Sequence, residues 1–98
     1  MDPLEAHINE SISVSQRHGY HPTEFIRMCN QYRSLPDVIT RLVTSGDIQS
    51  GFKRLEKLGL LDWSIETAVL KFPNYFSAET QACARFRLEE AARSGKRP

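Results

Sequence analysis

Apolar residues recur along this chain at three- and four-residue spacing, which is the period of an α-helix, and short polar stretches separate them. The first stretch places Leu4, Ile8 and Ile12 on one face. Asp2, followed by proline, is a typical helix start, because an aspartate side chain can accept backbone N–H groups of the first turn. Gly19 suits the left-handed residue that follows a helix end. The pattern predicts a first helix that ends just before this glycine.

Three more helices are predicted between Pro22 and Gly59, each with one apolar face. Their apolar positions are Phe25, Met28, Cys29 and Tyr32, then Val38, Ile39, Leu42 and Val43, then Ile48, Phe52, Leu55 and Leu58. Ser34 is the expected cap of the second of these helices and Asp47 that of the third. Gly51 lies inside the third at a cost of about 1 kcal/mol against alanine, and it indicates a close approach of another backbone.

Two helices are predicted in the last third of the chain. Residues 60–72 fit a period of two in part, but their composition favours a helix, with Asp62 or Ser64 as its cap. Ser77 is expected to cap the last helix, from Ala78 to about Ala92. Its apolar face holds Ala84, Leu88 and Ala91, with Ala82, Cys83 and Phe86 beside them. Six short helices predict an all-α fold, a compact orthogonal bundle formed by a single domain over 1–93, with a frayed tail at 94–98.

Composition and charge fit this fold and exclude some classes of protein. The 98 residues are 40% apolar and 26% charged, as in a globular domain, and the net charge of +1 excludes a strongly basic nucleic-acid binder. No apolar run approaches the roughly 20 residues of a membrane span, and the acidic start does not resemble a signal peptide, so we expect a cytoplasmic protein. Cys29 and Cys83 are too few for a disulfide scaffold.

No residue pattern predicts an enzyme, a metal site or a cofactor. His18, His21 and Cys29 lack the paired spacing of zinc ligands and are expected to be a polar turn and a core thiol. The prominent serines have capping roles, and no nucleophile elbow or glycine-rich phosphate loop is present. Glu66 is an acid with apolar neighbours, whose pKa would rise if it were partly buried, but we expect a surface or first-turn glutamate.

A DNA-binding alternative rests on residues 47–61. The run from Gly51 to Leu61 looks like the recognition helix and exit turn of winged-helix domains, and Lys53, Arg54 and Lys57 could contact phosphates. Two observations weigh against it. Three acidic residues balance these three basic ones within 47–62, and the stretch that follows lacks the basic, glycine-rich hairpin of a wing.

Four sequence blocks follow one another along the chain: Pro22-Thr23-Glu24-Phe25, then Ser50-Gly51-Phe52 with Leu55 and Leu58-Gly59, then Leu61-Asp62-Trp63-Ser64-Ile65-Glu66, and then Ala84-Arg85-Phe86-Arg87-Leu88. Together they resemble a small all-helical bacterial domain family of uncharacterised function. The similarity spans about residues 20–90 and implies an all-α fold with no associated enzymatic activity, cofactor or substrate. The chain departs from the family pattern after Met28, where Tyr32 to Pro36 replace a glycine-containing turn, and its first nineteen residues lie outside the resemblance.

The sequence therefore predicts a non-catalytic helical module that docks to a partner protein or to itself. Trp63, Phe72, Tyr75 and Phe76 gather around a proline turn and are the candidate partner-binding residues; the alternative, which burial statistics favour, is that they form part of the core. Asp62 and Glu66 could also form a paired-carboxylate site, but a capping role for this block is favoured because it satisfies the orphan donors of a helix start.

Overall fold

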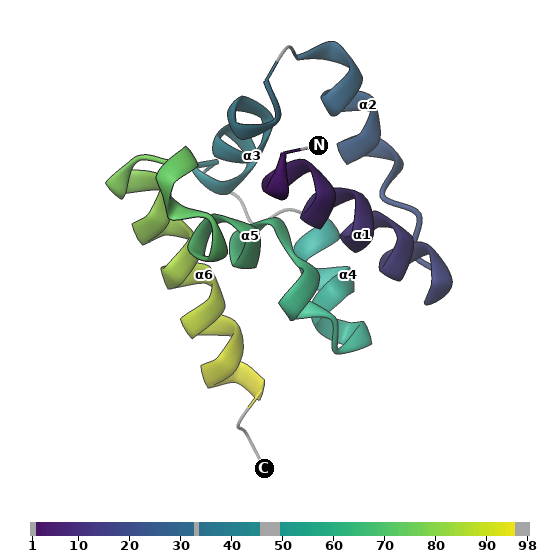
Figure 1. Ribbon diagram of the computed structural model, residues 1–98. Coiled ribbons are helices and arrows are strands. Elements are labelled where there is room, and N and C mark those ends of the chain that lie inside the picture. Colours follow the sequence, from purple (N-terminus) through teal and green to yellow (C-terminus); the bar gives the residue numbers. More distant parts are fainter. Residues whose placement is uncertain (1, 33, 46–49, 96–98) are drawn as a thin grey trace.

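The computed structural model describes residues 2–32, 34–45 and 50–95 and consists of helices joined by short turns (Figure 1). The elements are α1 (Pro3–Arg17), α2 (Thr23–Gln31), α3 (Leu35–Val43), α4 (Ser50–Leu58), the 3₁₀ turn η1 (Leu61–Trp63), α5 (Ile65–Lys71), the 3₁₀ turn η2 (Pro73–Tyr75) and α6 (Ala78–Gly95). The described residues contain no strand. The predicted all-α bundle is confirmed.

Helix ends are fixed by the capping residues that the sequence indicated. The side chains of Asp2, Ser34 and Ser77 each accept a backbone N–H from the first turn of the following helix, at 2.9, 3.4 and 3.1 Å. Gly19 and Gly59 follow α1 and α4 with φ angles of 84° and 71°, a left-handed conformation that only glycine adopts without strain.

The cap of α5 is Ser64, and the prediction of Asp62 as a structural cap is wrong. Ser64 Oγ accepts the backbone N–H of Thr67 at 3.2 Å and donates to the carbonyl of Leu61 at 2.8 Å. Asp62 is exposed within η1. The physical reason is the extra 3₁₀ turn, which leaves Ser64 as the residue with the extended backbone (φ −74°, ψ 160°) that an N-cap needs.

We expect Ser64→Ala to lower the free energy of unfolding by about 0.5–2 kcal/mol, because the first turn of α5 loses its side-chain acceptor. Asp62→Ala, its matched control two residues away, should change it by less than about 0.5 kcal/mol. Chemical denaturation measures both. Equal losses in the two variants would contradict the assignment of the cap.

The core lies where α1, α3 and α6 meet around α5, which stands at the centre of the bundle (Figure 1). Its buried apolar side chains are Leu4, Ile8, Ile39, Val43, Ala68, Val69, Phe76 and Ala84. α5 packs most extensively against α6. α2 differs from the other helices with fully described side chains, since none of its residues is buried.

The outward face of α6 differs from the predicted one. Phe86, expected beside the apolar face, is 62% exposed, whereas Arg87 is 5% exposed. Adjacent helix positions point about 100° apart, so the burial of Arg87 directs Phe86 outward. The helix also continues to Gly95, beyond the expected end at Ala92 and into the tail expected to fray from residue 94, and residues 96–98 lie outside the described part.

The close neighbour of Gly51 is a side chain, so the expectation of a backbone there is wrong. A Cβ atom added at Gly51 would lie 2.6 Å from the hydroxyl oxygen of Tyr20. The missing side chain therefore lets the Tyr20 ring lie against α4. Asp47, the predicted cap of α4, lies outside the described residues.

Candidate functional site

An apolar pocket of about 120 Å³ lies between α1, α2, α4 and η1. Its apolar wall is formed mainly by Ile12, Phe25, Met28, Phe52, Leu55 and Trp63. The volume is slightly below the about 150 Å³ of an apolar cavity that holds benzene. The pocket therefore has room for about one aromatic ring or one branched aliphatic group.

The pocket exists because α2 only partly buries its apolar side chains against the rest of the bundle. The predicted apolar stripe of α2 is present, but Phe25, Met28 and Cys29 are only half-buried. Pro22, which sets the entry to α2, is buried and lines the pocket with Tyr20. An amphipathic helix with no buried residue leaves apolar surface available to another group.

A second hollow, of about 380 Å³, lies on the other side of α2 against α1 and the start of α3. Its lining mixes apolar residues such as Ile26 and Leu35 with Glu5, Asn9 and Asn30. Neither of the two buried polar atoms that lack a hydrogen-bond partner among the described side chains belongs to its lining residues. The smaller pocket is therefore the better candidate site.

Five polar side chains interrupt the apolar wall of the pocket, those of Ser11, Ser15, Tyr20, Glu66 and Glu24, the last of which is exposed and paired with Arg27. The hydroxyl of Ser11 donates to the Ile8 carbonyl at 2.7 Å, and that of Ser15 donates to the Ser11 carbonyl at 2.8 Å. Burial raises the pKa of Tyr20, and nearby Arg54 opposes this effect. At neutral pH the phenol therefore keeps its proton.

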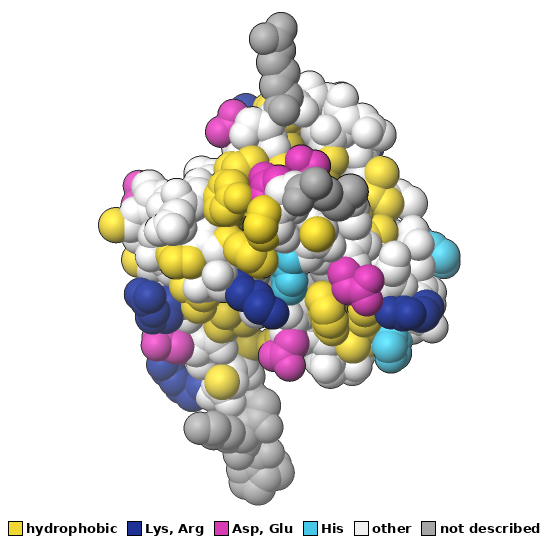
Figure 2. Space-filling model, in the orientation of Figure 1, with side chains coloured by type: hydrophobic (Ala, Val, Ile, Leu, Met, Phe, Trp, Pro, Cys, Tyr) yellow, Lys and Arg dark blue, Asp and Glu magenta, His cyan; other side chains and the backbone are white. Residues whose placement is uncertain are grey.

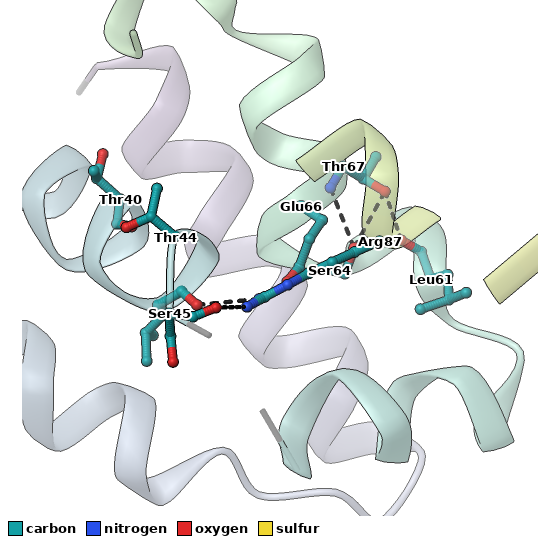
Figure 3. Close-up of polar contacts among 9 residues, drawn as sticks. Thr40, Thr44, Ser45, Leu61, Ser64, Glu66, Thr67 and Arg87 are labelled. Carbon is teal, nitrogen blue, oxygen red and sulfur yellow. Dashed lines mark hydrogen bonds and ion pairs between the residues drawn. The ribbon is translucent and has the colours of Figure 1, made fainter. Parts of the chain in front are cut away.

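Glu66 forms a buried ion pair with Arg87, which sequence reasoning missed. Glu66 is 1% exposed, and its Oε2 accepts from Arg87 Nη1 at 2.9 Å. The guanidinium also donates to the carbonyls of Leu42 (3.1 Å) and Ser45 (2.8 Å), so it ties α5 and α6 to the C-terminal end of α3 (Figure 3). Burial raises the pKa of Glu66, while Arg87 opposes the shift. Glu66 lies in the first turn of α5, as expected, but the expectation of a surface glutamate is wrong, because its carboxylate lies in the interior.

The paired-carboxylate hypothesis is also wrong. Asp62 is exposed on η1, whereas Glu66 is buried against Arg87, so the two carboxylates do not face one common site. Two signals in the sequence could have revealed the Glu66–Arg87 ion pair. The helical period places Arg87 on the buried side of α6, and Glu66 has apolar neighbours on α5.

The four candidate partner-binding aromatics lie in one row but differ in exposure. His7 stacks on Trp63 with ring centroids 5.3 Å apart and contacts Phe72 at 5.5 Å; Phe72 lies 6.5 Å from Tyr75, which lies 6.4 Å from Phe76. Phe76 belongs to the core, Trp63 and Phe72 are half-buried, and Tyr75 is 39% exposed.

Only one end of this row reaches the pocket. Trp63 lines the pocket, and the other end is tied to α1 by the hydroxyl of Tyr75, which donates to Asp2. Burial lowers the pKa of His7, and Lys71 adds to the effect. On the face of the molecule drawn in Figure 2, hydrophobic side chains form patches between charged ones rather than one broad surface. The row is therefore a packing element with Trp63 as its contribution to the site.

The basic residues of the DNA-binding alternative are exposed, but the architecture is not that of a winged helix. Lys53, Arg54 and Lys57 lie on the surface of α4. The elements that follow α4 are η1 and α5, and residues 50–95, all described, contain no β-hairpin that could act as a wing. The winged-helix interpretation of residues 47–61 is wrong in this respect, and DNA binding itself stays a prediction.

The described part of the chain holds no group of three or more His, Cys, Asp or Glu residues placed to bind a metal ion. His18 uses its Nδ1 atom in a 2.9 Å hydrogen bond with the carbonyl of Val14. Within residues 2–32, 34–45 and 50–95, no helix combines the length and apolar character needed to cross a membrane.

Comparison of the chain with protein-family models, with curated proteins and with solved structures finds no match. The resemblance to a bacterial helical family therefore stays a prediction that rests on its sequence blocks. What the protein does has to be inferred from the pocket itself.

Proposed function

We propose that the protein is a non-catalytic docking module that binds a partner polypeptide by taking one apolar side chain of the partner into the pocket between α1, α2 and α4. The observation that carries the proposal is the pocket wall of Phe25, Met28, Phe52 and Trp63. A few anchor side chains in desolvated pockets supply most of the binding energy of protein interfaces.

The size of the pocket favours a side chain over a free small molecule. Sites for cofactors and drug-sized ligands usually measure about 300–1,000 Å³, more than twice the 120 Å³ found here. One side chain fills a space of this size, and the rest of the partner can lie on the half-buried face of α2 beside it. The partner's contacts would then supply the burial that α2 lacks within the chain.

A selection from displayed random peptides tests the proposal. Peptides retained by the immobilised protein are expected to share one large apolar residue. Met28→Glu, which places a charge in the apolar wall, should abolish their binding because the charge would have to be desolvated. Asn30→Glu adds the same charge at an exposed position of α2 outside this pocket and should leave binding within about twofold.

Thermal melting of both variants shows whether each is folded. Binding that Met28→Glu and Asn30→Glu weaken equally would contradict docking in this pocket. Selected peptides without a common apolar residue would contradict the anchor.

A further inference from the structure

The pocket is lined by a residue with a buried polar atom that has no hydrogen-bond partner among the described residues, Oε1 of Glu66. The other carboxylate oxygen accepts from Arg87, which reaches it from α6 and does not line the pocket. Oε1 is therefore the carboxylate oxygen of Glu66 that still lacks a hydrogen-bond partner. A buried acceptor without a partner is costly, and such atoms are rare in native proteins.

None of the other polar groups on the wall donates to Oε1, the hydroxyl of Tyr20 included. The hydroxyl hydrogens of Ser11 and Ser15 are both used in bonds to backbone carbonyls within α1, so these side chains offer only lone pairs to the pocket. The wall is therefore rich in acceptors. A complementary ligand has to bring a donor.

The charge of the ion pair decides which kind of donor fits. Arg87 already neutralises Glu66 at 2.9 Å, so this part of the wall carries no net charge. An ammonium or guanidinium group would lose its hydration and would lie close to the like charge of Arg87. A neutral N–H on an aromatic ring avoids both costs and matches the apolar wall. The indole N–H is a neutral group that only donates.

We propose that the anchor is a tryptophan side chain of the partner polypeptide, whose indole N–H donates to Oε1 of Glu66. This inference rests on the proposed function, because it names the anchor that the same pocket takes. The pocket has room for about one ring, so the ring that carries the N–H lies between Phe25, Phe52 and Trp63, and the second ring of the indole stays at the opening. Tryptophan is among the residues most enriched at the energetic centres of interfaces.

Indole and 1-methylindole test the inference because the second carries a methyl group in place of the N–H hydrogen and cannot donate. Both are titrated into the ¹⁵N-labelled protein, and the amide signals of Ser11, Gly51 and Ile65 report occupation of the pocket. We expect indole to bind at least about tenfold more tightly, since a hydrogen bond to an ionised acceptor is among the stronger ones. Benzylammonium, a cation of similar size, should bind more weakly than indole.

Glu66→Gln gives a second, independent test. The amide must turn its carbonyl oxygen to Arg87, so its NH₂ group takes the place of Oε1, and the preference for indole over 1-methylindole should disappear. Glu79→Gln, the same change at an exposed position of α6, should keep the full preference. If Glu66→Gln does not fold, the comparison of the two probes on the unchanged protein decides alone.

Equal affinities for indole and 1-methylindole would overturn the inference and leave the docking proposal standing. Tighter binding of benzylammonium would also overturn it, because the pocket would then recognise a cation. If neither indole moves the pocket signals, both the inference and the proposed pocket are wrong.

Discussion

Arg87→Ala is expected to lower the free energy of unfolding by about 3–5 kcal/mol, because it breaks a buried ion pair by removing one partner. The variant leaves the carboxylate of Glu66 buried and without its cation, since Glu66 is only 1% exposed. It also removes the donors to the Leu42 and Ser45 carbonyls at the end of α3. Such a loss is a large share of the about 5–15 kcal/mol that stabilises a small domain. Urea denaturation followed by circular dichroism measures it.

Two controls separate the buried ion pair from a general effect of truncation on α6. Arg85→Ala removes an exposed arginine two residues away and should cost less than about 0.5 kcal/mol. The double variant Glu66→Leu/Arg87→Met removes both charges and should be more stable than Arg87→Ala, because no unpaired charge remains buried. A double variant as unstable as Arg87→Ala would show that the carbonyl contacts, and not the ion pair, carry the effect.

Leu4→Ala is expected to lower the free energy of unfolding by about 2–5 kcal/mol, through the lost transfer energy and the cavity left behind. Leu4 is fully buried in the cluster that also contains Ile39 and Val69. The prediction matters because the first nineteen residues lie outside the sequence resemblance. In the structure Pro3–Arg17 form α1, which supplies one side of the core and part of the pocket wall.

Glu5→Ala, on the exposed side of the same helix, is the matched control and should change the stability by less than about 0.5 kcal/mol. Chemical denaturation of both variants makes the comparison. A Leu4→Ala protein as stable as the Glu5→Ala protein would mean that α1 is an appendage and not a part of the core.

Much of the fold was predicted from the sequence because its signals are local. The caps Asp2, Ser34 and Ser77 act within one turn of the helix that each begins, and Gly19 and Gly59 act at the residue where a helix ends. Their chemistry needs no distant partner, so it can be recognised from a few neighbouring letters. The cap of α5 was harder to predict, because Asp62 and Ser64 are both capping residue types. The short turn η1 contains Asp62 and leaves Ser64 as the N-cap.

The site was predicted only in part. Trp63 was a candidate partner-binding residue and lines the pocket, whereas Phe72, Tyr75 and Phe76 do not. The pocket is also lined by Ser11, Tyr20 and Met28. The sequence around them shows only helix and turn patterns, which do not indicate a pocket. Which apolar residues line a pocket depends on how the helices cross, and the helical period does not contain that information.

The sequence by itself determined the all-α fold, with six α-helices in the part of the chain that the structure describes, since helical period, capping and glycine placement are properties of short segments. Only the tertiary structure decided that Glu66 and Arg87, which are 21 residues apart, form an ion pair in the interior. It also decided that the side chain of Tyr20 lies against Gly51. The reason is physical. A charge can be buried only where a partner from another element neutralises it, and that partner is fixed by the packing of α3, α5 and α6.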